Sequence, residues 1–201
     1  IKAVNTEGNT LLDALRIALT TEKPLPLKLP ATPFGVVSLH RFENIFKKDR
    51  LILILNLIEE AADQYQLVFV LHPATRKNLE KFGLLDRLAK NKRIHLCPRM
   101  GYFEFVGLLK QSTFVITDGG SNQEELSYLG KPTLLMRQAT ERQEGLGANV
   151  VLGAYQRSKM LDFINGLACA SVSEASLPDQ YPTIRIVDLL SEFTPSYPAS
   201  E

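Results

Sequence analysis

The sequence predicts an α/β protein with a doubly wound, mostly parallel, Rossmann-like sheet. Short segments that are apolar along their whole length alternate with longer amphipathic stretches, and such segments are typical of strands covered on both faces. Polar or glycine-containing loops follow most of them, as expected where a strand crosses over into a helix. Ligands of such sheets bind beyond the carboxyl ends of the strands. We therefore expect the function to reside in those loops.

The first 33 residues fall outside this pattern. Asn9 or Thr10 precedes a run of leucine, isoleucine and alanine whose spacing predicts a short amphipathic helix that ends near Thr20. Prolines at positions 24, 26, 30 and 33 follow, and neither a helix nor a central strand tolerates that density of missing N–H donors. We expect a helix and Pro-rich linker over residues 1–33, the Rossmann-like domain over residues 34–193 and a frayed tail over residues 194–201.

The alternating pattern after the linker predicts the following elements. The expected strands cover residues 35–39, 67–71, 94–96, 113–117, 133–136 and 150–152. The expected helices cover residues 48–64, 75–91, 102–110, 122–129, 156–168 and 183–193.

Composition excludes several classes of function. The 201 residues carry 23 Lys and Arg against 22 Asp and Glu, without a basic block, so we expect no nucleic-acid surface. The most apolar stretch, residues 51–58, is less than half of the roughly 20 residues that a bilayer span needs. Cys97 and Cys169 lack metal-site spacing, so we expect no metal and no disulfide framework, and a cytoplasmic location. The chain begins at Ile1, and we expect it to be part of a longer protein.

The sharpest chemical signal is residues 118–125, Asp-Gly-Gly-Ser-Asn-Gln-Glu-Glu. Two glycines let the backbone approach a ligand closely, and the free N–H groups at a helix start favour an anion such as phosphate. Ser121 or Asn122 could cap the helix, and Glu124 or Glu125 could close a capping box or bind sugar hydroxyls. The alternative is a Gly-Gly turn without a ligand.

Histidines end two of the predicted strands. His40 could act as an acid or base near neutral pH, and the neighbouring Arg41 could pair with phosphate. The alternative is a solvated loop in which the histidine bonds backbone. His72 ends the next strand, and we expect His95, inside a strand, to be structural.

Two further features each allow two interpretations. Residues 137–145 form a charged segment that is either a solvated surface or, through Arg142, a second contact to an anion at the 118–125 turn. Phe105 belongs to an aromatic group at helical spacing, which is typical of a core, although such a ring could also flank a base.

Three motifs together resemble the UDP-N-acetylglucosamine 2-epimerase family. Residues 40–44 (His-Arg-Phe-Glu-Asn) are similar to the family's His-Arg-Arg-Glu-Asn loop, residues 118–125 to Asp-Ser-Gly-Gly-Ile-Gln-Glu-Glu, and residues 140–144 (Thr-Glu-Arg-Gln-Glu) to Thr-Glu-Arg-Pro-Glu. The motifs occur in the family's order, and the resemblance extends from about residue 8 to residue 190. It implies the C-terminal half of a two-domain fold of the glycosyltransferase B type, which holds UDP, with the N-terminal domain missing.

The resemblance also implies roles for individual residues. His40 corresponds to the family histidine near the diphosphate and the scissile bond, which makes it the implied catalytic residue. The implied UDP-binding residues are Phe105 beside uracil, Gly119 and Gly120 at the phosphates, Ser121, Glu125 at the ribose hydroxyls, and Arg142.

The reaction that the resemblance implies is the interconversion of UDP-N-acetylglucosamine and UDP-N-acetylmannosamine, by elimination and re-addition of UDP, without a cofactor. Its proton-transfer carboxylates belong to the missing domain, so we expect the isolated chain to bind UDP weakly and not to epimerise. The implied partners are UDP, a UDP-N-acetylhexosamine and the missing domain. The resemblance leaves a homodimer open.

Three alternatives remain at this point. The first is a hydrolysing epimerase that releases N-acetylmannosamine and UDP. The second is a non-catalytic nucleotide-sugar binding module, which is favoured by departures from the family motifs: Gly119 replaces Ser, Phe42 replaces Arg and Gln143 replaces Pro. The third is a glycosyltransferase, because a shared fold alone does not determine function.

Overall fold

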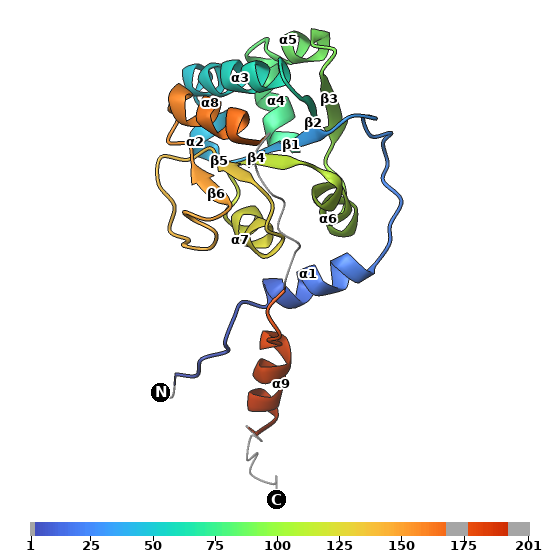
Figure 1. Ribbon diagram of the computed structural model, residues 1–201, viewed down its shortest axis with the longest axis vertical. Helices are drawn as coiled ribbons and strands as arrows, with labels where there is room; N and C mark the ends of the chain where they lie inside the picture. The colour runs from blue at the N-terminus through green and yellow to red at the C-terminus, as the bar shows by residue number, and fades with distance from the viewer. Residues whose placement is uncertain (1–2, 168–176, 193–201) are drawn as a thin grey trace, which may run out of the picture.

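The computed structural model describes residues 3–167 and 177–192, and its centre is a six-stranded sheet of order β3-β2-β1-β4-β5-β6 (Figure 1). All neighbouring strands are parallel. The strand order reverses between β1 and β4, as in a Rossmann-like fold, so the predicted fold class is confirmed. The strands are β1 (Phe34–Leu39), β2 (Gln66–Leu71), β3 (Ile94–Pro98), β4 (Phe114–Thr117), β5 (Thr133–Leu135) and β6 (Val150–Leu152).

Helices cover both faces of the sheet (Figure 1). One face packs against α3 (Lys48–Ala62), α4 (Pro73–Lys81), α5 (Leu85–Lys90) and α8 (Arg157–Gly166). The opposite face packs against α1 (Leu11–Thr20), α6 (Tyr102–Gln111) and α7 (Gly120–Tyr128). The short α2 (Phe42–Ile45) follows β1, and α9 (Pro182–Glu192) extends away from the sheet beyond α1.

The central strands are apolar throughout because both of their faces are buried. In β2, Leu67 and Phe69 belong to the core on the α3 side, whereas Val68 and Val70 belong to the core on the α6 side. Side chains alternate between the two faces of a strand, so a strand with helices on both sides needs an unbroken apolar run. This is why the sequence pattern located the strands correctly.

The prediction of a single helix over residues 75–91 is wrong, because two helices occupy this segment. Gly83 adopts a φ of +70° and ends α4. Its N–H donates to the carbonyl of Glu80, and the next N–H, of Leu84, donates to that of Leu79. This pair of bonds is the Schellman arrangement that commonly terminates a helix at glycine. The short α2 was also absent from the predicted elements.

Several expectations fall on residues that the structure does not describe. They are Cys169, the tail at residues 194–201 and the predicted last residues of the final two helices, 168 and 193. Within residues 3–167 and 177–192, no helix is both long and apolar enough to cross a membrane.

The topology brings the candidate loops to one edge of the sheet. In the strand register, Leu39 pairs with Leu71, and Ser38 pairs with Thr117. Thr117 pairs in turn with Leu135. The loops that follow β1, β2, β4 and β5 therefore begin side by side, which is where a doubly wound sheet binds its ligands.

We predict that Gly35→Ala destabilises the fold. A Cβ at position 35 would overlap the ring of Phe114, which is fully buried in the adjacent strand and has little room to move. Overpacking of this kind costs about 1–3 kcal/mol, to be measured by denaturant unfolding. Gly166→Ala is the matched control, because no atom lies within 4 Å of its added Cβ. Equal stabilities of the two variants would contradict the prediction.

Candidate functional site

Asp118, the first residue after β4, connects the loops that follow three strands. Its fully buried carboxylate accepts hydrogen bonds from the backbone N–H groups of His40 (3.0 Å) and Arg41 (3.0 Å) and from Nδ2 of Asn44 (2.9 Å). The Asn44 amide also donates to the carbonyl of Met136 after β5, at 2.9 Å. A buried carboxylate requires such donors, so these contacts fix the loops relative to one another. The sequence analysis assigned no role to Asp118 or Asn44.

His40 lies between this buried carboxylate and the start of α7. Its Nδ1 is 3.5 Å from Oδ1 of Asp118, while 42% of its side chain is exposed. A Cβ added to Gly119 would lie 3.1 Å from Cε1 of His40. The predicted proximity of His40 to the glycine turn is therefore confirmed, and Asp118 orients an imidazole that can act as an acid or base.

The start of α7 is open, because no side chain caps it. Gly119 is the N-cap residue and Gly120 the first helical residue. The prediction that Ser121 or Asn122 caps the helix is wrong: both lie within it, and the Asn122 amide donates to Oγ1 of Thr117 at 3.0 Å. The first N–H groups of a helix lack intrahelical partners. They are therefore available to an anion, which the helix dipole also favours.

Gln123 holds the charged segment 137–145 against this helix start. Its fully buried amide donates to the carbonyls of Arg142 (3.2 Å) and Glu144 (3.0 Å) and accepts a hydrogen bond from Thr140 Oγ1 (2.8 Å). All these contacts are at least partly buried. The segment is thus attached to α7 and is not a freely solvated loop.

Arg142 lies directly beside the glycine turn. A Cβ added to Gly120 would be 2.9 Å from Nε of Arg142. The guanidinium forms an ion pair with Glu124, which is almost fully buried and also accepts a 3.3 Å hydrogen bond from the amide of Asn9. Burial raises the pKa of Glu124, and Arg142 opposes that shift. The capping-box role predicted for Glu124 or Glu125 is wrong, because Gly119, at the cap, offers no side chain to complete it.

These residues surround a cavity of about 250 Å³, which we call the anion cleft. Besides the helix start it contains two guanidinium groups, those of Arg41 and Arg142. Its one carboxylate, Glu141, already pairs with Arg137 (2.9 Å) and lies 3.6 Å from Arg41. The lining residues are His40, Arg41, Gly119, Gly120, Ser121, Asn122, Glu141 and Arg142.

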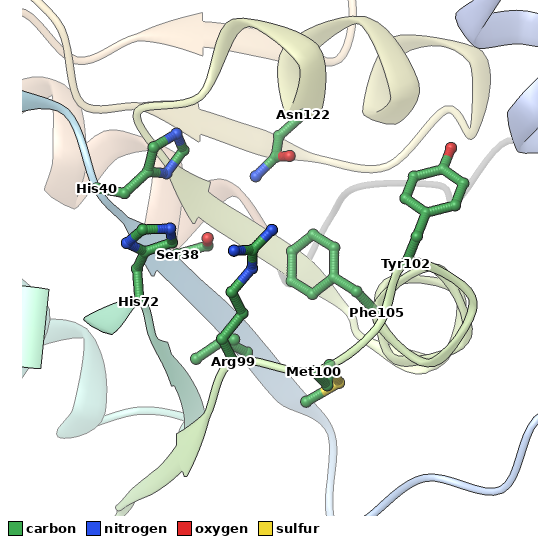
Figure 2. Close-up of a pocket in the computed structure, with 9 residues that line it drawn as sticks. Ser38, His40, His72, Arg99, Met100, Tyr102, Phe105 and Asn122 are labelled. Atoms are coloured by element: carbon green, nitrogen blue, oxygen red, sulfur yellow. The ribbon is translucent and has the colours of Figure 1, made fainter. Parts of the chain in front are cut away.

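A second cavity of about 250 Å³ adjoins the first, and we call it the aromatic cavity (Figure 2). His40 and Asn122 line both cavities. Phe105, which the sequence analysis placed beside a base, lines this cavity and not the anion cleft. The full lining set is Ser38, His40, Val70, His72, Arg99, Met100, Tyr102, Phe105 and Asn122.

Of these lining residues only His40 and Phe105 were predicted as site residues, and His72 and Arg99 are among those that were not. His72 and Arg99 directly follow β2 and β3, so the general rule of ligand binding at strand ends could have found them. The ring centroids of His40 and His72 are 5.7 Å apart. His95, by contrast, is exposed and lies 2.8 Å from the side-chain oxygen of Gln66, away from both cavities.

Glu125 is the one predicted site residue that lines neither cavity. It is 3% exposed. Burial raises the pKa of Glu125 to about 7, the nearby Tyr102 hydroxyl opposes that shift, and Glu124 adds to it. Glu125 in turn raises the pKa of the Tyr102 hydroxyl, so the two groups lie close together. Glu125 is therefore a neighbour of Tyr102, which lines the aromatic cavity.

Among residues 3–167 and 177–192, no three His, Cys, Asp or Glu side chains converge in a way that could hold a metal ion.

We predict that Asp118→Asn lowers the free energy of unfolding by about 2–4 kcal/mol. The amide retains one acceptor oxygen for three converging donors and adds an NH₂ group among them. Asp86→Asn is the control, because Asp86 is exposed in the first turn of α5. Chemical denaturation of both variants provides the measurement, and a D118N protein as stable as D86N would refute the central role of this carboxylate.

The sequence of this chain is similar to that of known proteins. The family profile described as UDP-N-acetylglucosamine 2-epimerase matches residues 2–181. A UDP-N-acetylglucosamine 2-epimerase of Methanocaldococcus jannaschii is 36% identical over 157 residues, which are 73% of this chain and 43% of the relative. A UDP-2,3-diacetamido-2,3-dideoxy-D-glucuronate 2-epimerase of Pseudomonas aeruginosa is 35% identical over 76% of this chain and 42% of its own length.

Solved structures show the same fold. The M. jannaschii epimerase in complex with UDP-GlcNAc and UDP superposes with a TM-score of 0.79 at 30% identity, over 92% of this chain and 54% of that one. The Neisseria meningitidis epimerase bound to UDP-GlcNAc gives a TM-score of 0.73 at 27% identity over the same shares. This chain thus spans less than half the length of the curated relatives described above. By the profile match and the sequence identity, the chain belongs to the UDP-N-acetylglucosamine 2-epimerase family.

Proposed function

We propose that this chain is the C-terminal, UDP-binding domain of a UDP-N-acetylglucosamine 2-epimerase. The observation that carries the proposal is the open start of α7, which faces a cleft with His40 and Arg142 on its walls. Relatives whose structures contain UDP-GlcNAc or UDP support the choice of ligand. On this proposal the diphosphate binds at the α7 amides, and the base occupies the aromatic cavity beside Phe105.

The reaction then proceeds by elimination and re-addition of UDP. The C2 proton of the sugar is removed, the bond between C1 and the diphosphate oxygen breaks, and UDP adds back after reprotonation on the opposite face. This domain stabilises the departing diphosphate, because preorganised N–H groups and cations act where negative charge develops. His40, oriented by Asp118, faces the same cleft and can donate a hydrogen bond or a proton to the leaving oxygen.

The remainder of the catalytic apparatus belongs to the other half of the protein. We assign the proton-transfer carboxylates, which the family resemblance implies, to an N-terminal domain. Residues 1–33 would connect that domain to this one. We place the intact protein in the cytoplasm. In this chain α1 packs on α6 and α7, and Leu12 and Leu15 are buried. The connection is thus anchored on the side of the sheet that carries the helix of the anion cleft.

The function is tested by comparing the 201-residue chain with the intact protein. The chain alone is expected to bind UDP weakly and to leave UDP-N-acetylglucosamine unchanged, whereas the intact protein forms UDP-N-acetylmannosamine. Chromatography identifies the products. Free N-acetylmannosamine would identify a hydrolysing epimerase, and UDP binding without turnover would identify a binding module. Turnover by the chain alone would refute the assignment of proton transfer to another domain.

Gly120→Ala in the intact protein tests the anion cleft directly, with Gly166→Ala as its matched control. The added Cβ displaces the Arg142 guanidinium, since it would lie 2.9 Å from Nε. We expect UDP affinity to fall about tenfold, which corresponds to the loss of one charge-assisted hydrogen bond. Gly166→Ala should leave UDP affinity unchanged, because the position is open and far along the chain in α8.

A second prediction concerns pH. The proposed ribose hydroxyls need the charged form of Glu125 as acceptor, and burial raises its pKa to about 7. Uridine affinity should therefore fall as the pH drops from 8 to 6, through the range in which Glu125 takes up a proton. Uridine is the appropriate ligand because it has no phosphate that titrates in this range. The measurement is calorimetry of the intact protein with uridine.

Glu125→Gln provides the comparison. The amide does not titrate, so its uridine affinity should vary less between pH 6 and pH 8 than that of the parent protein. This comparison also separates Glu125 from the histidines, which remain in both proteins. A parent affinity that is constant across this range would show that Glu125 does not hold the ribose.

A further inference from the structure

Arg99 is the first residue after β3, and its side chain enters the aromatic cavity (Figure 2). Its backbone N–H donates to the carbonyl of Leu71 at 3.2 Å, which holds the residue at the strand end. Figure 2 shows the guanidinium between the ring of Phe105 and the histidine pair. Arg99 is exposed and forms no ion pair or side-chain hydrogen bond with the described residues, so its guanidinium can contact a ligand in the cavity without breaking a contact within the domain.

The charge of Arg99 is uncompensated at this wall. No Asp or Glu lines the aromatic cavity. His72 does not add a second charge near neutral pH, because burial lowers its pKa and the nearby Arg99 and His40 lower it further. The Nδ1 atom of His72 is also buried without a partner among the described residues. The cavity thus combines one guanidinium with uncharged polar side chains and with apolar and aromatic side chains that include Met100 and Phe105.

Arg99 could serve either the phosphates or the base of a nucleotide. The phosphates have another place: the anion cleft contains the α7 amides with Arg41 and Arg142, and Arg99 does not line it. In the aromatic cavity Arg99 shares the wall with Met100 and Phe105. A planar, weakly hydrated guanidinium stacks on a flat π-system, and a base beside an aromatic ring offers such a surface.

Building on the proposed function, we propose that Arg99 is a base-binding residue whose guanidinium packs on the uracil ring while Phe105 contacts the same base. The aromatic cavity would then recognise the nucleoside independently of the phosphates. Arg99 acts in binding and takes no part in proton transfer.

The test measures four ligands on the intact protein: uridine, UMP, UDP and inorganic pyrophosphate, by competitive displacement or calorimetry. Arg99→Ala should weaken uridine, UMP and UDP by the same factor, about tenfold, as expected for the loss of one stacking partner. Pyrophosphate binding should not change. Arg99→Lys should lose most of the same affinity, because an ammonium group keeps the charge without the planar surface.

Arg93→Ala is the matched control, since Arg93 lies at the opposite, amino end of β3 and donates to the carbonyl of Asp63. It should bind all four ligands as the parent does. A loss that grows from UMP to UDP and spares uridine would make Arg99 a phosphate ligand and overturn the inference. An unchanged affinity for every ligand would also overturn it. If the parent protein itself failed to bind UDP, the proposed function would fall, and this inference with it.

Discussion

The geometry of the site depends on one buried carboxylate. Asp118 has no contact with water, and its donors come from residues 74–78 positions earlier in the chain. A charge in this position is tolerated only while those donors stay in place. The loop after β1 therefore cannot move away without leaving the carboxylate unpaired. His40 is held at the glycine turn by the same contacts, so the stability of the domain and the placement of its imidazole are inseparable.

Buried polar residues in the first turns of α7 hold the neighbouring 137–145 segment in the same way. Gln123, Glu124 and Glu125 are consecutive and all buried, although polar residues rarely occupy such positions without partners. Gln123 attaches the 137–145 segment, and Glu124 attaches Arg142. Glu125 interacts with Tyr102, a residue of the aromatic cavity. The buried polar residues of this helix thus hold the wall of the anion cleft through Gln123 and Glu124 and reach a residue of the aromatic cavity through Glu125.

The sequence determined the strands well because an unbroken apolar run has one structural cause in this fold, burial on both faces. It could not place the break at Gly83, because a glycine inside a helical pattern either continues or ends the helix. The anion cleft was predictable from motifs, whereas Asp118 gains its role only through contacts distant in sequence. Arg99 and His72 follow strands as single residues without a motif. The burial that raises the pKa of Glu125 arises only in the folded domain, and spacing alone does not reveal it.

The two cavities differ in the part of a reaction that they can influence. On the proposed function, a base in the aromatic cavity keeps the same contacts from substrate to product, and such uniform binding lowers KM without raising kcat. The anion cleft meets a diphosphate whose charge grows as the bond to the sugar breaks, and contacts that strengthen in the transition state raise kcat. His40 lines both cavities. It therefore lies between the contacts to the base, which stay constant, and those to the diphosphate, which change during the reaction. Asp118 restrains the His40 ring on one side, and the other side is open to the leaving group. His40 can therefore interact with the charge that develops on the diphosphate while its own position stays fixed.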